Sequence, residues 1–131
     1  MRAKTLMTLT LSILLIAPSA YAQRSASVTA KVPFAFNVAE KVLPAGEYKF
    51  SQSPGAAAIT VRSSDGKEAA MALILTRMAA GIHTTAQDSH VVFDKVGNSY
   101  FLSEIWVSGM DGYVLNVTKE MHEHAIVDTV E

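Results

Sequence analysis

The sequence predicts an all-β domain, a small antiparallel barrel or sandwich of six to seven short strands. Three observations support this fold class. Apolar and polar residues alternate over several segments, which is the period-two pattern of a half-buried strand. Turn signals rich in Gly, Pro and Asp separate these segments at short intervals. Half of the 131 residues are hydrophobic and 18% are charged, so the chain can form one core of modest size.

The first predicted strand covers residues 28–38, in which apolar side chains occupy every second position: Val28, Ala30, Val32, Phe34, Phe36 and Val38. Pro33 has no N–H to donate to a sheet ladder, so this strand is expected to lie at a sheet edge or to bulge at Pro33. Residues 43–46 (Leu-Pro-Ala-Gly) predict a turn in which the proline fixes φ. Tyr48 and Phe50 then alternate with polar residues in a second strand.

A β-hairpin is predicted around Asp65 and Gly66, which lie between two apolar segments, residues 57–63 and 67–77. Asp-Gly is a strong hairpin signal because a tight two-residue turn needs positive φ angles. Pairing about this turn gives two expected cross-strand pairs, Val61 with Ala70 and Ile59 with Ala72. Since both faces of the second segment are apolar, we expect a central strand that is buried on both sides.

Residues 68–80 have a second interpretation as a helix, because they are rich in Ala, Met and Leu and Gly81 could end a helix there. The Asp-Gly turn favours the strand. Residues 78–89 show no clear period and predict a loop.

A second hairpin is predicted around residues 97–98 (Gly-Asn), between strands at residues 89–96 and 99–107. The register of this turn gives two expected pairs, Phe93 with Leu102 and Val91 with Glu104. Glu104 and Trp106 would then share a face with core residues, and inside a barrel they could bind one small apolar ligand. The alternative is that a bulge, or a strand end open to solvent, turns Glu104 outward.

The C-terminal segment carries four apolar residues at helical spacing, Val114, Val117, Met121 and Ala125, which predict a short helix over residues 118–131. His122 and His124, with Glu120 and Glu123 beside them, form a candidate metal site. Two residues apart, the histidines would share one face of a strand and could chelate one ion. On a helix they would point about 200° apart. The helical spacing favours a solvated terminal helix over a metal site.

Composition and motifs exclude several classes of function. The chain has no cysteine, which excludes disulfides, thiolate zinc sites and a cysteine nucleophile. A formal charge of -1 provides no basic surface for nucleic acid. His90, Asp94 and Ser103 could be assembled on neighbouring strands, but strands lack the sharp turn and oxyanion donors of a nucleophilic site. No Gly-rich phosphate loop is found, so we expect neither catalysis nor a cofactor.

Residues 1–22 have the features of a secretory signal peptide. The segment begins with two basic residues, continues with an apolar run over residues 6–17, and then has Pro18 followed by small residues at Ala20 and Ala22. The apolar run is too short for a transmembrane helix, which needs about 20 residues. We therefore expect cleavage after Ala22.

The mature chain would then be one β-rich domain, residues 23–131, without a transmembrane span. Loss of two basic residues leaves 9 basic against 12 acidic residues, a net charge of -3. The location expected from the signal peptide is periplasmic or extracellular.

Residues 32–38 (Val-Pro-Phe-Ala-Phe-Asn-Val) and 41–48 (Lys-Val-Leu-Pro-Ala-Gly-Glu-Tyr) resemble the opening of an uncharacterised family of small exported acidobacterial proteins. Residues 63–67 (Ser-Ser-Asp-Gly-Lys) and 100–106 (Tyr-Phe-Leu-Ser-Glu-Ile-Trp) are similar to later blocks of that family. The resemblance covers residues 28–113, and the C-terminal segment departs from it. It implies export and a β fold, and it supplies no catalytic residues.

Three functions follow as hypotheses. The first is an exported, non-catalytic interaction or envelope-associated module, which pairs with another envelope protein or with a second copy through an exposed sheet edge, such as the Pro33 strand. The second is a carrier of a small apolar ligand beside Glu104 and Trp106. The third, ranked last, is a metal-binding protein that uses His122 and His124.

Overall fold

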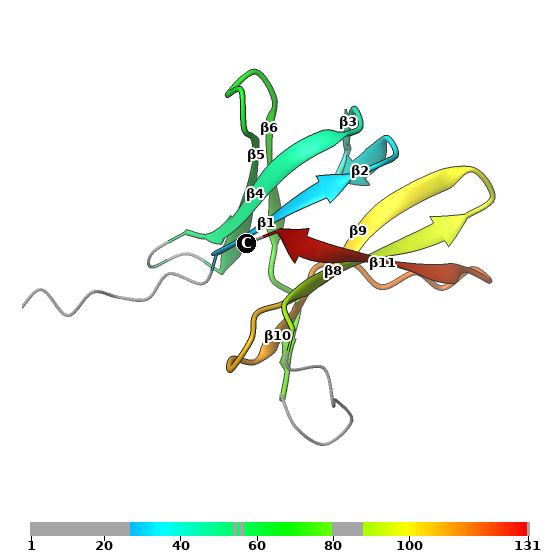
Figure 1. The fold of residues 1–131 in the computed structure, drawn as a ribbon. Coiled ribbons are helices and arrows are strands. Elements are labelled where there is room, and N and C mark those ends of the chain that lie inside the picture. Colours follow the sequence, from blue (N-terminus) through cyan, green and yellow to red (C-terminus); the bar gives the residue numbers. More distant parts are fainter. Residues whose placement is uncertain (1–26, 54, 56, 80–87, 131) are drawn as a thin grey trace, which may run out of the picture.

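The computed structural model describes residues 27–53, 55, 57–79 and 88–130, and this part of the chain forms eleven strands and no helix (Figure 1). In chain order the strands are β1 (Ser27–Val32), β2 (Phe36–Val38), β3 (Lys41–Leu43), β4 (Gly46–Gln52), β5 (Ala58–Ser63), β6 (Ala69–Leu73), β7 (Thr76–Met78), β8 (His90–Val96), β9 (Ser99–Trp106), β10 (Gly112–Val114) and β11 (Glu123–Val130). The all-β prediction is confirmed, although the strands are shorter and more numerous than the six or seven expected.

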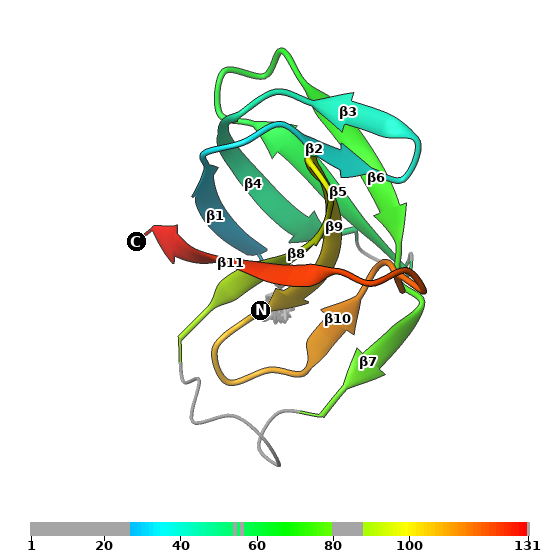
Figure 2. The same ribbon diagram turned by 90° about the vertical axis from the view of Figure 1, so that its right-hand side faces the viewer.

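The strands form one sheet that curls into a nearly closed barrel (Figure 2). Neighbours pair in the order β3-β2-β9-β8-β11-β1-β4-β5-β6. Strand β6 continues into β7 after two residues, β7 pairs with β10, and β10 pairs with β9. Through β7 and β10, the end of the sheet at β6 is therefore connected back to β9.

The predicted strand at residues 28–38 is two strands, β1 and β2, which are interrupted at Pro33. The prediction of an edge position is wrong, because β1 lies between β4 and β11. The ladder ends at Val32, so the missing N–H of Pro33 falls between strands rather than within one. The ends of the pairing path are instead β3 and β6.

The β5–β6 hairpin confirms the predicted pairs of Val61 with Ala70 and of Ile59 with Ala72. The tight two-residue turn is wrong, because the strands end at Ser63 and begin at Ala69 and Asp65 does not have a positive φ. Gly66 has φ +76° at the turn, and the backbone N–H of Lys67 donates to Asp65 Oδ1 over 2.9 Å. The strand interpretation is therefore correct and the helix alternative is wrong. The expectation of a central strand is also wrong, because β6 ends the path and leaves Met71 56% and Leu73 69% exposed.

The predicted C-terminal helix is wrong, because residues 123–130 form strand β11 between β8 and β1. The helical spacing that suggested it includes Met121 and Val117, which are 97% and 66% exposed and contribute nothing to the core. In β11 the period is two, and Ala125 and Val127 pack against the core from opposite Phe93 and Val91.

The core fills the inside of the barrel with large side chains. The largest fully buried residues are Tyr48, Phe36, Phe50, Phe93, Leu43, Ile59 and Ile105. The Phe36 ring meets Tyr48 and Phe93 edge-on, with ring centroids 5.0 and 5.1 Å apart. Edge-to-face contacts are a preferred arrangement of aromatic pairs, so these rings pack closely inside the barrel.

Some sequence predictions fall on other parts of the chain. The signal peptide at residues 1–22, and most of the loop predicted at residues 78–89, lie outside the described residues. In the part that the structure describes, no helix is long and apolar enough to cross a membrane.

Candidate metal centre

The β8–β9 hairpin contains a bulge that decides which side chains reach the outer face. Phe93 pairs with Leu102 as predicted, but a register shift follows between Val92 and Phe93, so that Val92 pairs with Glu104. The predicted pair of Val91 with Glu104 is therefore wrong. The extra residue is Ser103, and the bulge alternative for Glu104 is the one that the structure has.

Glu104 and Trp106 lie on the outer face of the barrel as a result. Trp106 pairs with His90, and their rings stack with centroids 6.0 Å apart. The Trp106 ring also lies against Gly112, where an added Cβ would come within 2.7 Å of the indole. A ligand bound by Glu104 and Trp106 would thus lie outside the barrel, in contrast to the cavity that the sequence suggested.

The outer face around Glu104 is rich in charge. Burial raises the pKa of Glu104, and the nearby Asp94 carboxylate raises it further, while His124, His90 and the Trp106 side chain act in the opposite direction. The net effect is a raised pKa. Glu104 therefore lies beside the Asp94 and His124 side chains without being the centre of the cluster.

This raised pKa predicts a pH-dependent gain in stability for Glu104→Gln. A carboxyl whose folded pKa is raised contributes stability below its unfolded pKa, about 4.3, and loses it as pH rises through the folded value. In metal-free buffer at pH 7 the variant should melt above wild type, by a few degrees at most because solvent screens this half-exposed group. The difference should vanish near pH 4, as thermal melts across pH would show. A constant difference across this range would contradict the assignment.

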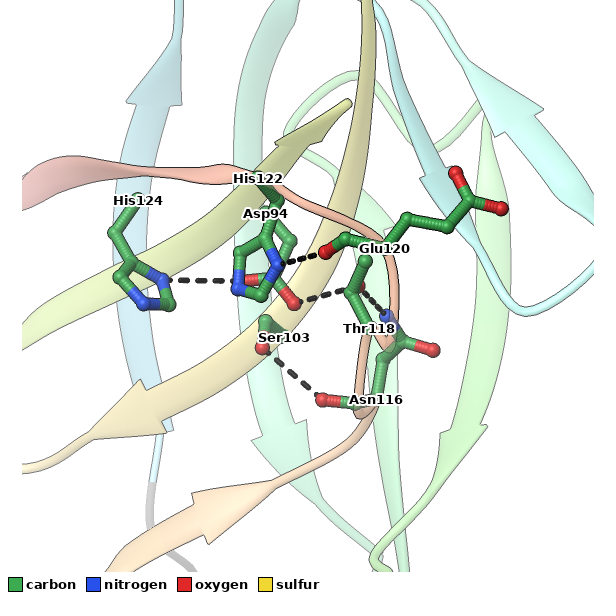
Figure 3. A network of polar contacts seen from close by, with 7 residues as sticks. All are labelled: Asp94, Ser103, Asn116, Thr118, Glu120, His122 and His124. Atoms are coloured by element: carbon green, nitrogen blue, oxygen red, sulfur yellow. Dashed lines mark hydrogen bonds and ion pairs between the residues drawn. The ribbon is translucent and has the colours of Figure 1, made fainter. Parts of the chain in front are cut away.

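A segment without strand structure, residues 115–122, follows β10 and crosses the outer face of β9 and β8; we call it the crossing segment (Figure 3). The backbone N–H of Leu115 donates to the Ser103 carbonyl over 2.7 Å. The Ser103 hydroxyl donates to the Asn116 carbonyl over 3.1 Å, and Asn116 Nδ2 donates to Thr118 Oγ1 over 3.0 Å. The bulge residue Ser103 thus holds the start of the crossing segment on the sheet.

Asp94, on β8, lies under the crossing segment with only 2% of its surface exposed. Its Oδ2 accepts a hydrogen bond from the Thr118 hydroxyl over 2.8 Å. Its Oδ1 lies 3.1 Å from His124 Nδ1 and 3.6 Å from His122 Nε2. The contact with His124 Nδ1 is a hydrogen bond, so Thr118 holds one oxygen and His124 the other, with the His122 ring beside it (Figure 3).

The two histidines reach Asp94 from consecutive parts of the chain. His124 is in β11, where it pairs with Asp94 across the sheet, and His122 is in the extended chain just before β11. His122 Nδ1 lies 2.7 Å from the Glu120 carbonyl. A carbonyl oxygen only accepts, so Nδ1 carries a proton and Nε2 is the atom that points at Asp94.

The three groups offer ligand atoms that all lie within 4.8 Å of one another. Two imidazole nitrogens and a carboxylate oxygen are typical ligands of Zn²⁺ and of other divalent transition metals. The separations of 3.1 and 3.6 Å from Asp94 Oδ1 are close to those between neighbouring tetrahedral zinc ligands, about 3.3 Å for bonds near 2.0 Å. Hydrogen bonds from Thr118 and to Glu120 orient the Asp94 and His122 side chains, as outer partners of metal ligands commonly do.

The sequence identified two of these three groups. His122 and His124 were the predicted pair, and they share a face because the chain there is extended. Glu120 takes part through its carbonyl, while its carboxylate points away from Asp94 (Figure 3). Asp94 and Thr118 were missed as members of the site. A lone acidic residue within the apolar strand β8 was the available signal for Asp94.

Comparisons of the chain with protein-family models, with curated proteins and with solved structures find no match.

Proposed function

We propose that this chain is an exported, non-catalytic β-domain that binds one divalent transition-metal ion through Asp94, His122 and His124. The observation that carries the proposal is the buried Asp94 carboxylate, which has one oxygen tied to Thr118 and the other facing two imidazole nitrogens. Export is supported by the signal-peptide features of residues 1–22 and by the resemblance to small exported proteins.

The orientation of His122 favours a cation at this place. Because its Nδ1 donates to the Glu120 carbonyl, the Nε2 atom of the neutral ring presents a lone pair toward Asp94 Oδ1. Two facing lone pairs repel each other, so a positive charge between them is needed for attraction. A metal ion between the two atoms supplies that charge, and the neighbouring ring nitrogen of His124 gives the ion a third ligand atom.

The site is accessible from solvent. The His124 side chain is 58% exposed and that of His122 is 21% exposed, while Asp94 closes the inner side. Three protein ligands leave further coordination positions for water or for a group of another molecule. These features suit reversible ion binding better than a closed structural zinc site, which has four protein ligands.

Isothermal titration of the mature chain with Zn²⁺ tests this proposal. We expect one ion per chain for wild type, and no saturable binding for a variant with both His122→Ala and His124→Ala. Glu123→Gln is the matched control, because Glu123 lies between the two histidines but is not part of the cluster. If the double variant binds zinc as tightly as wild type, the proposal is wrong.

A second candidate function is the interaction module, and the surface of β6 favours it. Residues 69–75 are all Ala, Met, Leu or Ile, and Met71, Leu73 and Leu75 are 56%, 69% and 59% exposed at the end of the pairing path. We propose that this edge pairs with an extended strand of another envelope protein or of a second copy. Crosslinking in the native envelope, with Leu73→Lys as the variant, should capture a partner for wild type only; equal capture by the variant would remove this candidate.

A further inference from the structure

We infer that the metal ion locks strand β11 into the barrel, and that without the ion β11 leaves its place and exchanges with the β11 of a second copy. This inference rests on the proposed metal site. It adds a conformational consequence and a partner, because the ligands come from parts of the chain that would separate if β11 detached. Asp94 is in β8, His122 is in the crossing segment, and His124 is in β11.

Strand β11 completes the barrel through one long and one short ladder. It lies between β8 and β1, and it is the only strand in the pairing path that links them. Six of its residues pair with β8, from Glu123 opposite Lys95 to Asp128 opposite His90. Only Thr129 and Val130 pair with β1. Loss of β11 would therefore open the sheet between two strands that already form long ladders with their other neighbours, β9 and β4.

The side chains of β11 are less buried than those of its neighbours, although Ala125 and Val127 pack against the core and the Thr129 hydroxyl donates to the Ser89 carbonyl over 3.1 Å. None of its eight residues is buried, and Ile126, in the middle of the strand, is 64% exposed. Strands β1, β4, β5, β8 and β9 each bury at least two side chains. Regions with few buried apolar contacts open locally at lower free energy than the core. The cluster around Asp94 is a polar side-chain attachment of β11 at the end where the strand begins.

The place that β11 leaves between β8 and β1 fits the β11 of a second copy, because the two chains are identical. A second copy of the chain carries the same β11, with the same register toward β8 and the same histidines for Asp94. Exchange of identical terminal elements is a low-cost route to dimers. The crossing segment has no strand pairing of its own, so it can straighten to reach a neighbouring molecule once Thr118 and His122 release Asp94.

Hydrogen exchange on the full mature chain tests the lock. If opening of β11 breaks the site, the protection of amides 123–130 should rise about tenfold for each tenfold increase in free Zn²⁺ above the dissociation constant. Before Zn²⁺ is added, the β11 amides should be less protected than those of the buried strand β5, which exchange only when the whole domain unfolds. If titration shows one bound Zn²⁺ and the β11 amides do not respond, the inference is wrong while the proposed function stands. If no Zn²⁺ binds, both fail.

Strand exchange is tested by mixing ¹⁵N-labelled and unlabelled mature chains and recording native mass spectra. Mixed dimers should form in EDTA, and at saturating Zn²⁺ they should form at least tenfold more slowly, because each exchange requires β11 to leave the ion site first. Because the chain has no cysteine, the pair His90→Cys with Asp128→Cys, which face each other in β8 and β11, gives a clean control. Its oxidised form should not exchange and its reduced form should. Absence of mixed dimers in EDTA, or exchange by the oxidised form, would overturn the inference.

Discussion

Replacing Asp94 by Asn is expected to lower the affinity for Zn²⁺ by at least about 100-fold, or about 2.7 kcal/mol of binding free energy. The amide has the size of the carboxylate and can still accept the hydrogen bond of Thr118, so the local fold should persist. What is lost is the negative charge and the oxygen that faces His122 and His124. Loss of outer partners alone weakens metal sites by 10–100-fold, and loss of a ligand should cost more.

The comparison is made by titration calorimetry at one pH and one salt concentration. Glu123→Gln removes the same charge from the strand that carries His124, yet Glu123 faces Lys95 in the register and is not in the cluster. Its affinity should stay within about twofold of wild type, since exposed charges are screened. Equal losses for both variants would mean that only the net charge matters, and would contradict a ligand role for Asp94.

Replacing Phe93 by Ala is expected to destabilise the domain by about 3–5 kcal/mol, as is usual for removal of a buried aromatic ring. Phe93 is fully buried in β8, and its ring meets Phe34 and Phe36 edge-on at 5.0 and 5.1 Å. It also lies between Leu102 and Ala125 on the neighbouring strands. A loss of this size is a large share of the stability of a small domain.

Urea unfolding in metal-free buffer measures this effect. Ile126→Ala is the matched control, because Ile126 lies one pairing row away on β11 but is 64% exposed on the outer face. We expect the control to change the unfolding free energy by less than about 1 kcal/mol. If Phe93→Ala is as mild as Ile126→Ala, the ring is not in the core and the barrel arrangement described above is wrong.

The parts of the fold that were predictable depend on local chemistry. Asp65 and Gly66 lie at the centre of a short loop, and the loop determines the register of β5 and β6 because only five residues separate the two strands. The same logic holds for Phe93 and Leu102 after the turn at residues 97–98. The register predicted from that turn is wrong beyond the pair of Phe93 with Leu102. The bulge at Ser103 depends on contacts with the crossing segment, which the turn does not contain.

The parts that were missed depend on pairing between distant segments. Strand β11 pairs with β8 across about thirty residues of chain, and no local pattern specifies that pairing. Because that pairing is not visible in the sequence, the spacing of the apolar residues around Met121 predicts a helix, although Met121 and Val117 are exposed. In the same way, β6 read as a central strand because its outer face is apolar, whereas the structure leaves that face open.

The candidate site also has one part that local sequence predicts and one part that depends on the fold. His122 and His124 are two residues apart, so their shared face follows from extended structure alone. Asp94 joins them only through the β8–β11 register, and Thr118 only through the path of the crossing segment. A sequence motif could therefore suggest the histidine pair, but the carboxylate ligand requires the three-dimensional fold.

The most direct test of the metal site is anomalous scattering at the zinc edge from crystals of the mature protein grown with Zn²⁺. We expect one strong peak at bonding distance, about 2.0–2.2 Å, from Asp94 Oδ1 and from one ring nitrogen each of His122 and His124. A zinc ion bound without Asp94, or no zinc at this cluster under conditions that saturate the protein, would contradict it.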